Sequence, residues 1–225
     1  MTDEGAGNIP ILYQRNGILL CQKPAGILSQ GGTDADPSLP MLFRGEFGGD
    51  LPAVITRLDR GVGGVCVLAS PKAAAPMTAL VQDHERFVKE YLAIAELREG
   101  TPGTEGRMED LLYHDAARNK TFPVKKMRRG VKKAILTYRL LAEREGLGLF
   151  LVRLYTGRTH QIRVQFASRR MPLFGDGKYG SVRKGEIALF AHRVSFPCPD
   201  GSGAAEGMAV PTAETAPWDL FSDFL

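Results

Sequence analysis

Apolar residues in this chain alternate with polar residues mostly at a spacing of two, which is the pattern of half-buried β-strands. One run, residues 64–69 (GVCVLA), is continuously apolar, as expected of a strand that is buried on both faces. Polar turns such as Gln14–Gly17 and Glu143–Gly146 separate neighbouring runs. Strands are predicted over residues 11–13, 17–22, 64–69, 89–96, 134–142, 147–155 and 187–196.

Two segments predict helices. Ser70 resembles an N-cap and is followed by Pro71, which suits the first helical position, so a helix is predicted from there to about Phe87. A shorter helix is predicted from about Thr159 to Ser168. Residues 97–118 are expected to be a loop, and residues 29–50 a loop that could include one helical turn. Many strands, few helices and hairpin-length connections predict an α+β fold around a mixed, mostly antiparallel sheet, flanked by helices and loops.

The length of 225 residues suits one substantial domain. No internal repeat and no linker divides the chain, so residues 9–225 are predicted to form a single domain after a disordered leader, residues 1–8. The N-terminus is polar and acidic, unlike a signal peptide. No apolar run approaches the length of a membrane span, so no membrane association is expected.

The charge and the cysteines refine this description. Lys and Arg number 29 against 25 Asp and Glu, a net charge of +4. This modest excess favours a polyanionic partner without establishing one. The three cysteines are widely spaced and indicate reduced core residues, hence a cytosolic protein. The four histidines lack metal-ligand spacing, so no metal site is expected.

The most biased stretch is a basic run that ends at Lys133. Its sequence, ARNKTFPVKKMRRGVKK, contains eight Lys or Arg residues and no acid. Such a run is often only a solvated face, but it is also what a phosphate-binding loop requires. A loop with this density of like charge repels itself and should be mobile when it is free.

A carboxylate lies between two arginines in Ile55-Thr56-Arg57-Leu58-Asp59-Arg60, just before the glycines of residues 61–64. Asp59 would then lie at the mouth of a buried strand, where the backbone can approach a ligand closely. On local chemistry alone, a surface salt-bridge cluster is the favoured interpretation of this segment.

A second polar segment, Thr156–Ala167 (TGRTHQIRVQFA), leads from a glycine turn into the short predicted helix. It carries Arg158, His160, Gln161 and Arg163, which could also form no more than a solvated helical face. The later sequence GDGKYG, residues 175–180, is rich in glycine but lacks the spacing of a phosphate-binding loop.

Six segments occur in an order that resembles one family, the RluA-type pseudouridine synthases. They are QKPAG (22–26), TRLDR (56–60), KEYLA (89–93), GRTHQIRV (157–164), GD-x-x-YG (175–180) and LFAHRVSF (189–196). RLDR together with GRTHQIRV makes the resemblance specific, and it extends over roughly residues 9–200.

The resemblance implies an RNA-modifying enzyme that isomerises uridine to pseudouridine and needs neither cofactor nor metal. Asp59 would be the catalytic carboxylate, acting as either a base or a nucleophile. Arg163 would pair with Asp59 and hold it charged. Tyr91 would lie against the uracil ring and assist removal of the C5 proton.

The resemblance also implies a cleft that binds RNA and flips the target uridine out of its stack. Arg57 would fill the space left by that uridine. The residues expected to contact RNA are Arg57, Arg60, Lys120, Lys125, Lys126, Arg128, Arg129, Arg158, His160 and Gln161. The partner would be ribosomal or transfer RNA, and the protein is expected to be a monomer without the small S4 RNA-binding domain.

Three positions depart from the family pattern: Thr56 and Gln165 stand where histidine is common, and Gly61-Val62-Gly63-Gly64 replaces an acidic residue and a Thr-Ser-Gly turn. The hydrogen bonds around Asp59 should therefore differ. A non-catalytic RNA-binding relative of the same fold is the main alternative. A hydrolase with paired carboxylates is disfavoured because no second acid lies near Asp59 in the sequence.

Overall fold

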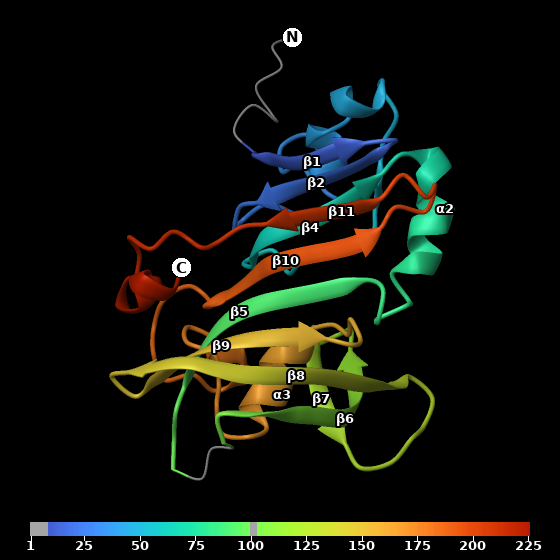
Figure 1. The fold of residues 1–225 in the computed structure, drawn as a ribbon. Helices are drawn as coiled ribbons and strands as arrows, with labels where there is room; N and C mark the ends of the chain where they lie inside the picture. Colours follow the sequence, from blue (N-terminus) through green and yellow to red (C-terminus); the bar gives the residue numbers. More distant parts are fainter. Residues whose placement is uncertain (1–8, 100–102) are drawn as a thin grey trace. The chain divides into compact units, whose positions relative to one another are not determined.

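The structure, a computed structural model, describes residues 9–99 and 103–225. The predicted disordered leader, residues 1–8, lies outside this range. The described residues divide into two compact units, one of residues 9–89 and 191–210, the other of residues 90–99, 103–190 and 211–225. Each unit combines antiparallel strands with short helices (Figure 1), which confirms the α+β class.

The first unit is built on the strand order β1-β2-β4-β10. The bounds are β1 Ile11–Arg15, β2 Ile18–Lys23, β4 Gly63–Ala69 and β10 Leu189–Pro197, with β3 Ala53–Val54 paired to β4 and β11 Ala204–Met208 paired to β10. The turn between β1 and β2 has positive φ at Asn16 and Gly17, as a two-residue hairpin turn requires. All seven residues of β4 are buried, as the apolar run predicted.

Three helical segments accompany these strands, α1 Leu39–Leu42, η1 Gly45–Phe47 and α2 Pro71–Leu80. The helix α2 begins as predicted, and the Ser70 side chain accepts a hydrogen bond from Ala73 N–H. It ends at Leu80 and not near Phe87, so the predicted end was wrong. The side chain and the carbonyl of Asp83 accept hydrogen bonds from Arg86 N–H and Phe87 N–H, and this turn replaces further helix.

The second unit has the strand order β5-β9-β8-β6-β7. The bounds are β5 Val88–Glu96, β6 Glu105–Asp115, β7 Lys120–Val124, β8 Val131–Arg144 and β9 Leu147–Leu154. The prediction of a loop over residues 97–118 was wrong, because β6 occupies half of it. Strand β6 alternates poorly in hydrophobicity, and its pairing with β8 over residues 105–113 provides the hydrogen bonds that its sequence pattern does not predict.

The helix α3, Gln161–Ala167, was predicted nearly correctly and provides the core of this unit. Phe166 meets Tyr138 and Phe150 edge to face, with ring centroids 5.9 Å and 5.3 Å apart. Two 3₁₀ helices, η2 Gly177–Tyr179 and η3 Trp218–Phe224, complete the unit. No helix within the described residues is long and apolar enough to span a bilayer.

The cysteines agree with their prediction as core residues. Cys21, Cys66 and Cys198 are buried, and none forms a disulfide bond. Burial raises the pKa of the Cys66 thiol to about 12, which keeps this thiol protonated at neutral pH.

Candidate functional site

In the first unit, the segment with Asp59 forms a tight turn between β3 and β4. Asp59 is half-buried, and its carbonyl accepts a hydrogen bond from Val62 N–H at 3.0 Å. The preceding residue, Leu58, is held through its main chain. Its N–H donates to Ser29 Oγ at 3.0 Å, and the Ser29 hydroxyl donates to the Leu58 carbonyl at 2.9 Å. The backbone beside Asp59 is therefore fixed by a buried side chain far away in sequence.

Lys23 fastens the other side of this turn. Its side chain is fully buried, and its ammonium group donates to the carbonyls of Pro24 (2.8 Å), Ile27 (2.7 Å) and Arg60 (3.2 Å). Burial lowers the pKa of Lys23, while the nearby Asp59 charge acts in the opposite direction. Lys23 thus joins the QKPAG segment to the RLDR segment. The sequence analysis had given it no role, although the lysine of the QKPAG motif was visible.

The departures from the family pattern have structural roles here. The hydroxyl oxygen of Thr56 accepts a hydrogen bond from Val67 N–H at 2.9 Å, so it ties the segment to β4. Gly64 has a φ of +117°, and a Cβ at this position would lie 2.2 Å from the Ala191 carbonyl oxygen. Only glycine fits between these strands.

The two arginines that flank Asp59 point to different surroundings. Arg57 is exposed. Arg60 forms a bidentate ion pair with Asp36, at 2.8 Å and 3.0 Å, with both side chains about half exposed. Such a solvated pair contributes little stability and can exchange partners at low cost. The predicted contacts of Arg57 and Arg60 with RNA stay predictions.

In the second unit, Arg163 of α3 forms a bidentate ion pair with Asp176. Nε donates to Oδ2 at 2.7 Å and the second nitrogen donates to Oδ1 at 2.8 Å, while the side chains are only 7% and 1% exposed. The guanidinium carbon also lies 5.2 Å from the centroid of the Tyr179 ring. Asp176 was not predicted as a partner of Arg163, although it stands in the GD-x-x-YG segment.

A hydrogen-bonded group surrounds this ion pair. The Tyr179 hydroxyl accepts from Thr121 N–H at 2.8 Å and lies 2.9 Å from His160 Nδ1. The Thr121 hydroxyl donates to the Thr159 carbonyl at 2.8 Å. Burial raises the pKa of Tyr179, so its hydroxyl remains protonated and can donate to His160. These contacts join the start of α3 to the edge strand β7.

The polar residues at the start of α3 form hydrogen bonds with other groups of the protein. Gln161 Oε1 accepts from the Thr156 hydroxyl (2.7 Å) and from Arg158 N–H (3.0 Å), and its amide nitrogen donates to the Ile135 carbonyl (3.0 Å). Arg158 Nε donates to the Lys133 carbonyl at 2.9 Å. His160 and Gln161 are buried. The hydrogen bonds of Gln161 and Arg158 anchor the start of α3 to β8, and the predicted RNA contacts of these residues stay predictions.

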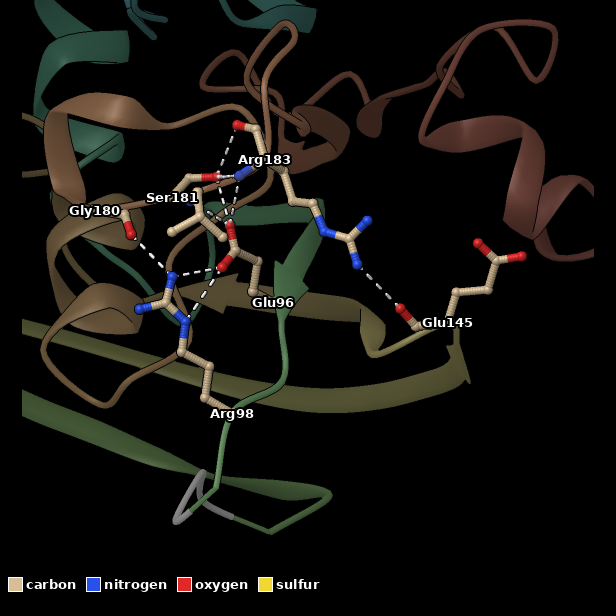
Figure 2. Close-up of polar contacts among 7 residues, drawn as sticks. Glu96, Arg98, Glu145, Gly180, Ser181 and Arg183 are labelled. Carbon is tan, nitrogen blue, oxygen red and sulfur yellow. Dashed lines mark hydrogen bonds and ion pairs between the residues drawn. The ribbon is translucent and has the colours of Figure 1, made fainter.

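Tyr91 is a buried residue of β5. The same strand ends in a buried carboxylate, Glu96, which Figure 2 shows with its partners. Glu96 Oε1 accepts from the Ser181 hydroxyl (2.6 Å), Val182 N–H (2.9 Å) and Arg183 N–H (3.3 Å). Its other oxygen accepts from Arg98, which also donates to the Gly180 carbonyl at 2.9 Å.

These donors determine the charge of Glu96. Burial raises the pKa of its carboxyl group, but the hydrogen bonds from Ser181, Arg98 and the backbone outweigh burial and hold the pKa below the ordinary value. Glu96 and Asp176 therefore secure the segment of residues 175–183 at two points. Neither role was predicted, because the partners of Glu96 in this segment lie about 85 residues further along the chain.

The basic run is divided among β7, a connection and the start of β8, so its prediction as one loop was wrong. Thr121, Phe122 and their neighbours form β7, which pairs with β6. The tip cations, Lys125, Lys126, Arg128 and Arg129, lie in the connection between β7 and β8 and are exposed. None of them forms an ion pair within the residues that the structure describes. Arg128 lies over the Tyr113 ring, 5.1 Å from its centroid, and Lys120 lies over Phe122 and Tyr179.

Residues 17–168, more than half of the chain, match the model of the family described as RNA pseudouridylate synthase. The chain belongs to this family. The match confirms the resemblance drawn from the motifs, and it includes the segments that carry Asp59, Tyr91 and Arg163. In this pseudouridylate synthase family member, Asp59 lies in the first unit, and Tyr91 and Arg163 lie in the second. Their catalytic roles, and the pairing of Asp59 with Arg163, stay predictions.

Several relatives carry names from the same family. The ribosomal large subunit pseudouridine synthase D of Borreliella burgdorferi is 31% identical over 207 residues, which cover 84% of this chain and 62% of the relative. The protein of the same name from Zymomonas mobilis is 29% identical over 191 residues, covering 80% of this chain and 59% of the relative. This chain therefore spans about three fifths of the length of these relatives.

Solved structures show the same fold. Human RNA pseudouridylate synthase domain containing 1 has a TM-score of 0.73 at 21% identity, covering 98% of this chain and 90% of the other. Human RNA pseudouridylate synthase domain containing 4 has a TM-score of 0.72 at 20% identity, covering 90% and 88%. These likenesses confirm the pseudouridine synthase-like fold.

Proposed function

We propose that this protein isomerises uridine to pseudouridine within structured RNA, with Asp59 as the catalytic carboxylate. The observation that best supports the proposal is that hydrogen bonds hold the main chain of the RLDR turn in place. Lys23 and Ser29 fix the backbone on both sides of Asp59, in a chain whose family is that of the RNA pseudouridylate synthases. A carboxylate whose backbone is fixed is preorganised for catalysis, because no free energy has to be spent on placing it when the substrate reacts.

The reaction breaks the N1–C1′ bond of the uridine, turns the uracil ring and joins C5 to C1′. The C5 proton leaves to solvent and N1, freed from C1′, takes up a proton, so that the product is an isomer of the substrate. Asp59 acts on the ribose, as a base or as a nucleophile. Tyr91 lies against the uracil, and its hydroxyl assists removal of the C5 proton. Arg163 pairs with Asp59 and keeps it charged.

The substrate uridine must leave its stack, which costs a few kcal/mol and is easiest in an unpaired region. Arg57 then occupies the vacated space. We take ribosomal RNA as the first candidate substrate, because relatives at 29–31% identity are named large-subunit synthases. Transfer RNA is the second candidate, and the expected place of action is the cytoplasm. The exposed tip cations are available for RNA phosphates and would order around them.

The test is release of tritium from C5-labelled uridine in deproteinised bacterial large-subunit ribosomal RNA. The wild-type protein should release tritium, and Asp59→Asn should release none while it still binds the RNA. Asp36→Asn provides the matched control, since Asp36 is an exposed carboxylate of the same unit that pairs with Arg60. Turnover by Asp59→Asn would remove Asp59 from its role. Binding without release by the wild-type protein on both ribosomal and transfer RNA would favour the non-catalytic alternative.

A further inference from the structure

One face of the sheet in the second unit is open to solvent over part of its area. The helix α3 covers the other face, where Val164 packs against Leu112 of β6 and Ala134 of β8 (Figure 1). Side chains alternate along a strand, so odd-numbered residues in these parts of β6 and β8 lie on the face away from α3. Arg107, Thr137 and Arg153 stand side by side across this open face, as the strand registers show.

An aromatic ring lies among the charges of the open face. Tyr155 follows directly after β9, and its N–H donates to the Ile135 carbonyl at 3.0 Å, which continues the ladder with β8. The guanidinium carbons of Arg153 and Arg107 lie 5.1 Å and 5.7 Å from the centroid of the Tyr155 ring. The ring is partly exposed. Tyr155 therefore has an electron-rich ring that already attracts cationic groups.

Beside Tyr155 the open face is hollowed into a groove of about 530 Å³. Its walls include Glu105, Thr137, Arg139, Leu151, Arg153 and Tyr155. Glu105 and Arg139 stand directly opposite one another in the register of β6 and β8, and both are exposed. Within residues 9–99 and 103–225, neither one forms an ion pair. The groove thus offers a carboxylate and a guanidinium that, within the described part of the chain, face one another without forming an ion pair, and Glu90 is a second carboxylate in its lining.

We propose that this groove binds one unpaired base of RNA, stacked on Tyr155, with the adjoining phosphate on Arg139. This inference rests on the proposed function only in taking RNA as the partner. Aromatic rings and guanidinium planes are the surfaces on which proteins stack unpaired bases, and open β-sheet faces are a common place for them. The carboxylate of Glu105 repels phosphate, so the groove selects the base for its interior and leaves the phosphate to Arg139.

The same carboxylate gives the groove a preference among bases. An ionised carboxylate only accepts hydrogen bonds, so it favours a base with an amino group at its edge. Adenine, cytosine and guanine have such a group, and uracil has none. The groove should therefore hold a base elsewhere in the RNA and not the uridine that is isomerised, because Tyr91 lies on the α3 face of the sheet, where its register partner Val152 is aligned with Tyr138.

The first experiment measures the affinity of the whole chain for a labelled short oligoadenosine RNA by fluorescence anisotropy. Tyr155→Leu should weaken this binding at least about 5-fold, the lower end of what one base–aromatic stack contributes. Tyr155→Phe, which keeps the ring, should bind like the wild-type protein. Phe224→Leu is the matched control, because Phe224 is an exposed ring of the same unit with a guanidinium, that of Arg144, 5.6 Å from its centroid. It should leave the affinity unchanged.

A second measurement tests the base preference. The wild-type protein should bind oligoadenosine more tightly than oligouridine, and Glu105→Gln should narrow this difference. Equal affinities of Tyr155→Leu and Phe224→Leu would overturn the proposal. Inorganic pyrophosphate provides a further test, as a competitor of oligoadenosine binding. If pyrophosphate competes with oligoadenosine, and Arg139→Gln abolishes this competition while Tyr155→Leu does not change it, the groove is a phosphate site and the base-stacking proposal is overturned.

Tritium release separates this inference from the proposed function. Tyr155→Leu should raise KM for ribosomal RNA about as much as it weakens oligoadenosine binding, with little change in kcat. If Tyr155→Leu matches the wild-type protein in both binding and release, the groove proposal fails while the proposed function stands. If the wild-type protein binds oligoadenosine through Tyr155 but releases no tritium, the proposed function fails while the groove proposal stands.

Discussion

The buried ion pair between Arg163 and Asp176 should make a large contribution to stability when one partner is removed. Arg163→Met keeps much of the side-chain volume but leaves the Asp176 carboxylate, 1% exposed, without its guanidinium. Loss of one partner of a buried ion pair typically costs about 3–5 kcal/mol, because the remaining charge is neither solvated nor paired. For a chain of this size, that corresponds to a fall in Tm of about 6–20 °C.

The assay is urea unfolding of Arg163→Met, Asp176→Asn and the double variant, followed by circular dichroism. Each single change should lower the free energy of unfolding by about 3–5 kcal/mol. The double variant should be destabilised clearly less than the sum of the two single effects, because it leaves no uncompensated charge. Additive effects would mean that the two groups do not act as a pair.

Arg169→Met is the matched control. Arg169 lies just beyond α3 and pairs with Asp110 at 2.9 Å, but its side chain and that of Asp110 are 26% and 20% exposed. Water can compensate such a charge, so the destabilisation should be about 1 kcal/mol or less. If Arg163→Met is destabilised no more than Arg169→Met, burial of the pair does not have the effect argued here.

Three further predictions concern the reaction, RNA binding and pH. Tyr91→Phe should keep RNA binding but slow product formation in a single-turnover assay, and an unchanged rate would leave Tyr91 with packing alone. Replacing the four tip cations by glutamine should weaken RNA binding and flatten the slope of log affinity against log salt by about 0.7 for each phosphate that is no longer neutralised, with little effect on folding; equal slopes would mean that these cations do not touch phosphate. The pKa of Glu96 is below its ordinary value in the folded protein, so its ionised form stabilises the fold above that ordinary value and the contribution disappears as the pH falls through the lowered pKa. The stability advantage of the wild-type protein over Glu96→Gln should therefore be full near neutral pH and shrink in acid, as measured by urea unfolding across pH; an advantage that does not change with pH would contradict this reasoning.

The sequence predicted the elements whose pattern is local and strong. Strand β4 is continuously apolar, the first hairpin has Asn16-Gly17 at its turn, and α2 begins with Ser70-Pro71. It failed where an element depends on distant partners. Strand β6 has weak alternation and β7 lies inside a run of like charge, yet both form because β8 and β6 supply their hydrogen bonds.

The same division holds for the candidate site. The motifs indicated the family and singled out Asp59, Tyr91 and Arg163, because the residue types required by the chemistry stand in short, recognisable segments. The groups that hold these segments were not predicted. Lys23 binds the Arg60 carbonyl, and Asp176 binds Arg163, across 37 and 13 residues.

By itself, the sequence determined where apolar and polar residues alternate, where turns begin and which segments carry the motifs of the family. These are properties of neighbouring residues. Only the tertiary structure decided the partners of the buried charges, Lys23, Glu96 and Arg163. A buried charge is tolerated only where hydrogen bonds or an opposite charge surround it, and the chain supplies those groups from whichever distant segments the fold brings together. The groove beside Tyr155 has the same origin, because the register of three strands, and no single stretch of sequence, sets its walls.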